Sequence, residues 1–187
     1  ELAPGLTAQA GNLPTLKELS SPAALANFSF GQGSSLATPL QIARIVSIIG
    51  NDGAAITPSL VRGFTQDGLS FSERAPNYAG SQVLSLQTAR KMQELMVGVV
   101  EDGSGHTARP LVGSAGGKTS SAQTGFVTGE GKEAKEIVHA WFAGFYPAQQ
   151  PRYSIVVFVE GGESGERVAA PIFKQIADGI AAKNPIS

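Results

Sequence analysis

The 187-residue sequence has no cysteine, which excludes thiol catalysis, disulfide bonds and cysteine-ligated zinc. Its two histidines, His106 and His139, are far apart in the sequence, so we predict neither a metal site nor a cofactor. We expect His139 to be a packed or hydrogen-bonding strand residue. The net charge of −1 gives no electrostatic reason to expect binding to nucleic acid or to an anionic membrane. Lack of cysteine fits an extracytoplasmic protein.

Long apolar runs are also missing: no stretch of about 18 apolar residues is present, so no membrane-spanning helix is predicted. The chain starts at Glu1 with neither a methionine nor a charged-then-apolar leader, and we expect it to be a segment of a longer protein. Its 23 glycines and 11 prolines indicate many turns. We divide one domain into a loop-rich lead-in over 1–35, a helical part over 36–112, and three strands with a terminal helix over 113–187.

Helix signals are clear at three places. Thr38 is a good N-cap, Pro39 suits the first helical position and Gln41 completes a capping box, so a helix is predicted to begin there and to end by residue 50. Apolar residues at helical spacing predict two more helices, over 86–101 and 168–182. The methionines of the second helix are interpreted as core residues.

Strands are predicted over 116–126, 138–146 and 153–160, and an extended stretch over 56–64. The short, proline-containing connection at 147–151 favours an antiparallel pairing of the second and third strands. The sequence therefore predicts an α+β fold, with an antiparallel sheet flanked by helices.

The first of these strands carries the main chemical signal, Gly117-Lys118-Thr119-Ser120-Ser121. A lysine beside a row of hydroxyls is suited to hold a carboxylate next to an acyl-transfer centre. Strand alternation predicts Lys118 and Ser120 on one face, with Thr119 and Ser121 on the other. Taken alone, Lys118 is better explained as an ordinary edge-strand lysine that discourages strand pairing.

Other patterns resemble nucleotide-binding motifs but lack the neighbouring residues or elements that those motifs need. A phosphate-binding loop needs a glycine where Val112 stands and a helix after its threonine. The dinucleotide-like glycine patterns at 103–108 and 129–134 lack the strand–turn–helix setting. Glu160, Glu163 and Glu166, among glycines, are interpreted as a solvated turn.

Three blocks, in this order, resemble class B penicillin-binding proteins over roughly residues 28 to 183. The blocks are Phe30-Gly-Gln-Gly33 with Ala37-Thr-Pro-Leu-Gln-Ile-Ala43; Val99-Val-Glu-Asp-Gly-Ser-Gly105; and Gly117-Lys-Thr119 continuing through His139-Ala-Trp-Phe-Ala-Gly-Phe-Tyr-Pro147 to Ala169-Ala-Pro-Ile-Phe173. Lys118-Thr119-Ser120 is similar to the family's Lys-Thr-Gly motif, with Ser120 in the glycine place.

The resemblance implies a serine-type peptidoglycan D,D-transpeptidase that cross-links stem peptides ending in D-Ala-D-Ala and binds β-lactams, on a serine β-lactamase-like fold. The family's nucleophile motif, Ser-x-x-Lys, and its Ser-x-Asn motif are absent here. The chain therefore resembles the C-terminal portion of the domain, inactive alone, from an extracytoplasmic parent anchored by an N-terminal membrane helix.

By the same resemblance, Lys118 and Thr119 are expected to bind the substrate carboxylate, and the backbone N–H of Ser121 to donate to the oxyanion. Ser120 is expected to line the substrate site and to crowd it. The expected partners include the missing N-terminal half of the domain or a second copy of the chain. The alternatives are a non-catalytic scaffold or binding domain of cell-wall assembly, and an unrelated hydrolase domain.

Overall fold

A three-stranded antiparallel sheet forms the centre of the computed structural model, which describes residues 8–73, 80–129, 131 and 134–184. The strand order is β3 (Gly116–Thr128), β4 (Lys135–Tyr146) and β5 (Tyr153–Val159). Both neighbouring pairs are antiparallel, so the predicted sheet and the predicted α+β fold class are confirmed. β3 and β4 begin and end within three residues of their predicted limits.

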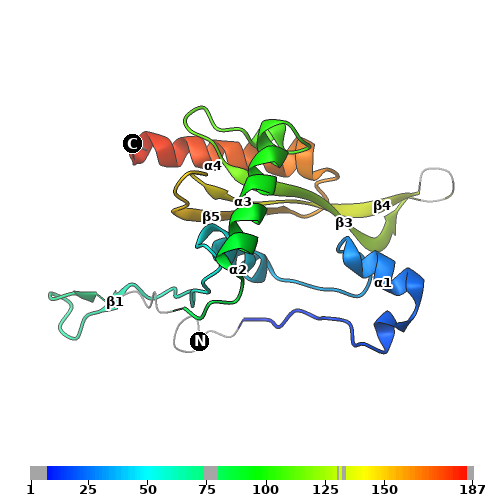
Figure 1. Cartoon of the computed structure of the whole chain (residues 1–187), viewed down its shortest axis with the longest axis horizontal. Helices are drawn as coiled ribbons and strands as arrows, with labels where there is room; N and C mark the ends of the chain where they lie inside the picture. Colours follow the sequence, from blue (N-terminus) through cyan, green and yellow to red (C-terminus); the bar gives the residue numbers. More distant parts are fainter. Residues whose placement is uncertain (1–7, 74–79, 130, 132–133, 185–187) are drawn as a thin grey trace.

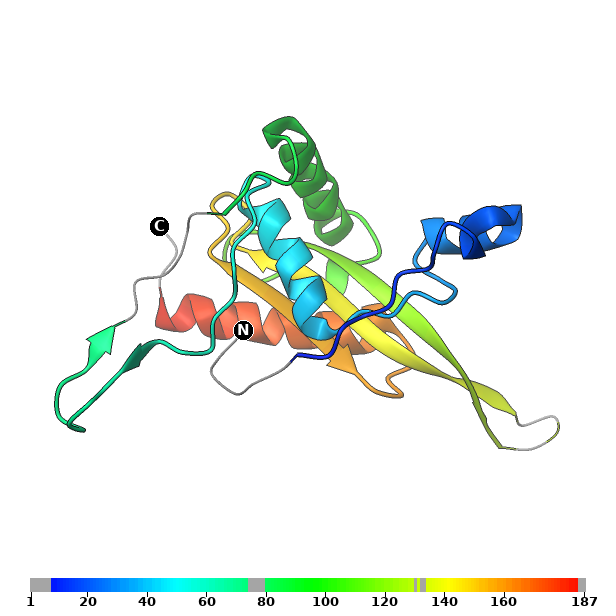
Figure 2. The ribbon, with the colours of Figure 1, turned by 90° about the horizontal axis from the view of Figure 1, so that it is seen from below.

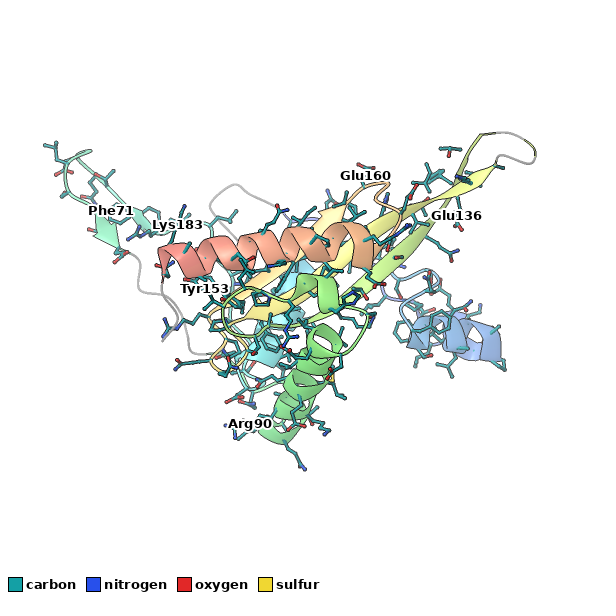
Figure 3. All side chains as sticks on the ribbon, turned by 90° about the horizontal axis from the view of Figure 1, so that it is seen from above. Phe71, Arg90, Glu136, Tyr153, Glu160 and Lys183 are labelled. Carbon is teal, nitrogen blue, oxygen red and sulfur yellow. The ribbon has the colours of Figure 1, made fainter. Side chains whose placement is uncertain are left out.

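Helices cover both faces of the sheet (Figures 1 and 2). Helix α4 (Ala170–Lys183) lies across one face, and α2 (Pro39–Gly50) lies on the other. Helix α3 (Leu86–Glu101) packs beside β3, with side chains in the core on both sides of the sheet. Figure 3 shows α4 over the sheet, with Tyr153 near its C-terminal end.

Local sequence signals explain where α2 and α3 begin. The Thr38 hydroxyl accepts a hydrogen bond from the Gln41 N–H, and the Gln41 side chain accepts one from the Thr38 N–H, which confirms the predicted capping box. Ser85 caps α3 by accepting from the Thr88 N–H.

Helix α4 starts later than predicted because a π-helical turn, η4 (Gly165–Ala169), precedes it. The other elements are η1 (Glu18–Ser20), α1 (Pro22–Ser29), β1 (Gly63–Phe64), β2 (Ser72–Glu73) and η2 (His106–Ala108).

The core has one cluster on each face of the sheet. On the α4 face, Phe142 and Phe173 are fully buried, with ring centroids 4.6 Å apart. On the α2 face, Phe145 packs with Val46, Ile49 and Met96. Burying such aromatic side chains from both faces fixes the position of β3 and β4.

The periphery is much less covered. The β1–β2 hairpin and the segment around α1 project from the body (Figures 1 and 2). The predicted extended stretch at 56–64 has strand geometry only at its end, in β1. Leu13, Leu16 and Leu69 are each more than three-quarters exposed. Within the described residues, no helix has the length and apolar character needed to cross a bilayer.

Candidate active site

Glycines bring β3 close to two buried rings just before Lys118. A Cβ atom at Gly117 would overlap the Phe142 ring, and a Cβ atom at Gly116 would overlap the Phe145 ring. Glycine at both positions therefore lets the strand lie directly against core aromatics on each face. This packing fixes the backbone that leads into the predicted site.

The four predicted site residues alternate between the two faces of β3. Lys118 and Ser120 are exposed and pair in register with Ala143 and Trp141 of β4. Thr119 is only 9% exposed, with Phe142 of the α4 face as its register partner. The side chains of Lys118 and Thr119 thus leave the strand on opposite faces.

Both hydroxyls on the α4 side of β3 have partners. The Thr119 Oγ1 atom lies 3.0 Å from Ser104 Oγ, in the turn after α3. The Ser121 Oγ atom accepts a hydrogen bond of 3.2 Å from the N–H of Gly165, the first residue of η4. Neither Ser104 nor Gly165 is predicted from the sequence to be a site residue. Ser104 lies in the second of the three blocks that resemble the family, and Gly165 lies in a glycine-rich turn.

The outer edge of β3 has no partner strand among the described residues. The carbonyl groups of Gly116 and Ala143 point between β3 and β4. A Cβ atom added at Gly144 would overlap the Gly116 oxygen, and one added at Gly117 would lie 3.2 Å from the Ala143 oxygen. Residues 116, 118 and 120 therefore direct their N–H and C=O groups to β4, and residues 119 and 121 direct theirs to the free edge. The Ser121 N–H consequently faces outward, where it is available to a ligand that lies along the edge.

Lys118 is the cationic group at this edge. Its Nζ atom donates a 2.7 Å hydrogen bond to the Thr119 carbonyl oxygen, so the ammonium group lies over the edge rather than away from it. A cation, an outward N–H group and two hydroxyls within four residues form an anion-binding arrangement.

Two further residues contact Glu166 of η4. The Nδ1 atom of His106 is 3.6 Å from a carboxylate oxygen of Glu166, and the Thr107 hydroxyl donates to the Glu166 carbonyl oxygen at 2.6 Å. Glu160 and Glu163 are exposed, as the solvated-turn interpretation predicts, whereas Glu166 is half-buried within η4 although its side chain is still 44% exposed. The described residues contain no cluster of three or more acidic or histidine side chains arranged to hold a metal ion.

His139 is part of the sheet rather than of this group. Its Nδ1 atom accepts a 3.1 Å hydrogen bond from the Gly161 N–H, and its ring meets Phe158 edge-on at 5.2 Å. The interpretation of His139 as a packed, hydrogen-bonding strand residue is confirmed.

The sequence over residues 6–178 matches the penicillin-binding protein transpeptidase domain, and the chain belongs to this family. It is similar to the peptidoglycan D,D-transpeptidase MrdA of Acinetobacter baumannii, with 33% identity over 160 residues, which cover 78% of this chain and 23% of MrdA. It is also similar to the peptidoglycan D,D-transpeptidase PbpA of Mycobacterium tuberculosis, with 32% identity over 88% of this chain and 33% of PbpA. The chain thus spans about a quarter to a third of these relatives.

A solved structure gives the same assignment. Penicillin-binding protein A from Mycobacterium tuberculosis, as its ceftriaxone acyl-enzyme complex, matches with a TM-score of 0.71 and 31% identity over 84% of this chain and 35% of that one. The resemblance found in the sequence, and the penicillin-binding transpeptidase fold that covers only part of the domain, are therefore confirmed.

Proposed function

We propose that this chain supplies the carboxylate-binding edge and one oxyanion donor of a serine-type peptidoglycan D,D-transpeptidase. The observation that carries the proposal is the free edge of β3, where the Lys118 ammonium and the outward Ser121 N–H lie within four residues. The likeness to proteins named peptidoglycan D,D-transpeptidase, and to a β-lactam acyl-enzyme, supports this reaction class.

In the proposed reaction, a serine from a segment outside this chain attacks the carbonyl carbon between the last two residues of a D-Ala-D-Ala stem peptide. A serine–acyl bond forms, the peptide bond breaks, and the terminal D-alanine leaves with a proton on its amine. An amine of a second stem peptide then takes the acyl group and releases the serine. A β-lactam reacts in the first step only, by opening of its ring.

In both steps, residues of this chain stabilise negative charge on the substrate carboxylate and on the oxyanion. Lys118 attracts the terminal carboxylate and eases proton movement near the serine, since a nearby cation lowers the cost of negative charge. Thr119 and Ser121 contribute hydroxyl donors, and Ser120 lines the face shared with Lys118. The Ser121 N–H stabilises the developing oxyanion, a contact commonly worth about 3 kcal/mol.

The location of the proposed substrate implies the location of the protein. Peptidoglycan lies outside the cytoplasmic membrane, so the proposed site is extracytoplasmic, in a parent protein anchored by a membrane helix outside this chain. The exposed apolar side chains and free strand edge are proposed to be covered by the N-terminal half of the domain. Self-association is the alternative for the isolated chain.

Labelling of the full-length protein with a fluorescent penicillin tests the proposal. We expect the unaltered protein to be acylated, and Lys118→Ala to slow acylation by on the order of 10²-fold, because the carboxylate anchor and local charge are lost together. Lys135→Ala is the matched control, since Lys135 is an exposed lysine at the start of β4 in the same sheet.

The outcomes separate the competing interpretations. No labelling of the correctly folded full-length protein would refute the enzyme and favour a non-catalytic scaffold. Labelling that responds equally little to Lys118→Ala and Lys135→Ala would keep the enzyme but remove Lys118 from its site.

A further inference from the structure

Two hydroxyl groups on the α4 side of β3 are each held by a group from a different part of the chain. Ser104 lies 3.0 Å from Thr119, and the Gly165 N–H donates to Ser121 at 3.2 Å. Ser104 follows α3 and Gly165 opens η4, so two separate elements converge on alternate residues of one strand. Neither contact forms part of the sheet's own hydrogen bonding.

The polarity of the Ser121 contact is fixed by chemistry. A serine hydroxyl has one proton to donate and two lone pairs, whereas a backbone N–H only donates. Because Ser121 Oγ accepts from Gly165, its own proton is not used in this contact. The contact therefore leaves the Ser121 hydroxyl ready to donate to an acceptor at the edge, and polarises it in that direction.

The Thr119 contact has two arrangements, because either hydroxyl can donate to the other. When Ser104 donates, the Thr119 proton is free to point elsewhere. An anion at the edge of β3 favours that arrangement, since it needs donors and repels lone pairs. Thr119 is almost buried, so its hydroxyl has few alternatives to Ser104 in the absence of a ligand.

Gly165 reaches Ser121 only because it has no side chain. A Cβ atom there would overlap the Ser120 carbonyl oxygen and would lie 2.6 Å from the Trp141 carbonyl oxygen and 2.8 Å from the Ser120 nitrogen. These are backbone atoms of paired strands, which cannot move aside singly. Any larger residue would lift η4 from the sheet and lengthen the contact with Ser121.

We propose that Ser104 and Gly165 are positioning residues, which orient the Thr119 and Ser121 hydroxyls as donors to the carboxylate of the substrate or of a β-lactam. The inference rests on the proposed transpeptidase function. It adds that recognition of the carboxylate depends on two residues that do not touch it.

The test compares acylation of the full-length protein by benzylpenicillin and by its methyl ester, which carries no negative charge at the carboxylate position. The unaltered protein is expected to prefer the free acid. Ser104→Ala should reduce that preference about fivefold, the effect of one modest hydrogen bond, while Ser104→Thr, which keeps the hydroxyl, should restore it. Ser47→Ala is the control, because the Ser47 hydroxyl donates to the Arg44 carbonyl oxygen within α2, away from β3.

Gly165→Ala gives a second measurement where the variant folds, with a reduction of the acid preference of about tenfold, because the contact of Ser121 is lost. A general structural role would slow both compounds equally in Ser104→Ala and leave the preference unchanged, which would overturn the inference while the proposed function stands. If neither compound acylates the unaltered protein, the proposed function is overturned, and this inference with it.

Discussion

Replacing Gly117 by alanine tests whether close packing of β3 on the core positions Lys118. The new Cβ atom would overlap the Phe142 ring and would lie 3.2 Å from the Ala143 carbonyl oxygen. The Phe142 ring cannot swing away, because it is fully buried and packed against the Phe173 ring. Either the strand or the ring must therefore shift.

The size of the effect follows from two opposing terms. Overpacking a dense core costs about 1–3 kcal/mol. Loss of glycine's freedom in the unfolded chain returns about 0.5–1 kcal/mol. We expect Gly117→Ala to lower the free energy of unfolding by about 1–2 kcal/mol, and to slow acylation because the Lys118 backbone moves with it.

Chemical denaturation of the full-length protein measures the stability change, and Gly98→Ala is the matched control. Gly98 lies inside α3 and has nothing within 4 Å of its Cβ position, so alanine there should stabilise the helix by up to about 1 kcal/mol. Phe142→Leu should compensate Gly117→Ala in part, so that the double variant is more stable than the sum of the single effects. A Gly117→Ala protein as stable as the unaltered one would refute the packing argument.

Three further predictions concern pH, the serine in the glycine place, and assembly. Burial opposes ionisation of Asp178, but hydrogen bonds from Lys174 and from the Leu111 N–H outweigh it and hold its pKa below the ordinary value. This stabilisation is therefore present above about pH 4 and lost as the pH falls through the lowered pKa, so Asp178→Asn should lower the denaturation midpoint at pH 7 and have little effect at strongly acidic pH. Ser120→Gly should leave β-lactam acylation equal or faster at a stability cost of about 1 kcal/mol, and slower acylation at unchanged stability would show that the hydroxyl takes part directly. The isolated chain should associate in light scattering and take up no fluorescent penicillin; a monomer at high concentration would contradict the first expectation, and labelling at a defined serine the second.

Short-range signals in the sequence predicted the secondary structure well. The Thr38–Gln41 capping box and the apolar spacing of residues 86–101 act within one or two turns, so α2 and α3 have their expected limits. The start of α4 was placed two residues early because the stretch before residue 170 is also helical, as the π-helical turn η4. An apolar period does not distinguish these two helix types.

Contacts between distant residues explain what the sequence did not predict. The position of Lys118 on a strand followed from its neighbours, whereas Ser104 and Gly165 reach β3 from 15 and 44 residues away. Glu166 likewise is half-buried because it meets His106 and Thr107, which no local pattern indicates. The chemical types were readable in sequence, but their convergence depends on how α3 and η4 pack on the sheet.

The geometry of β3 also bears on how Ser120, in the glycine place of the family motif, would affect the proposed site. Groups of residues 119 and 121 face the free edge, so a ligand lying along the edge meets them first. The Ser120 side chain instead leaves the strand perpendicular to that direction, on the Lys118 face. Under the proposed function, its hydroxyl would therefore meet ligand groups over the Lys118 face, and not the groups bound by the Thr119 and Ser121 hydroxyls on the other face. The substitution should accordingly alter the choice among ligands with different groups on that face, and leave the anion-binding edge intact.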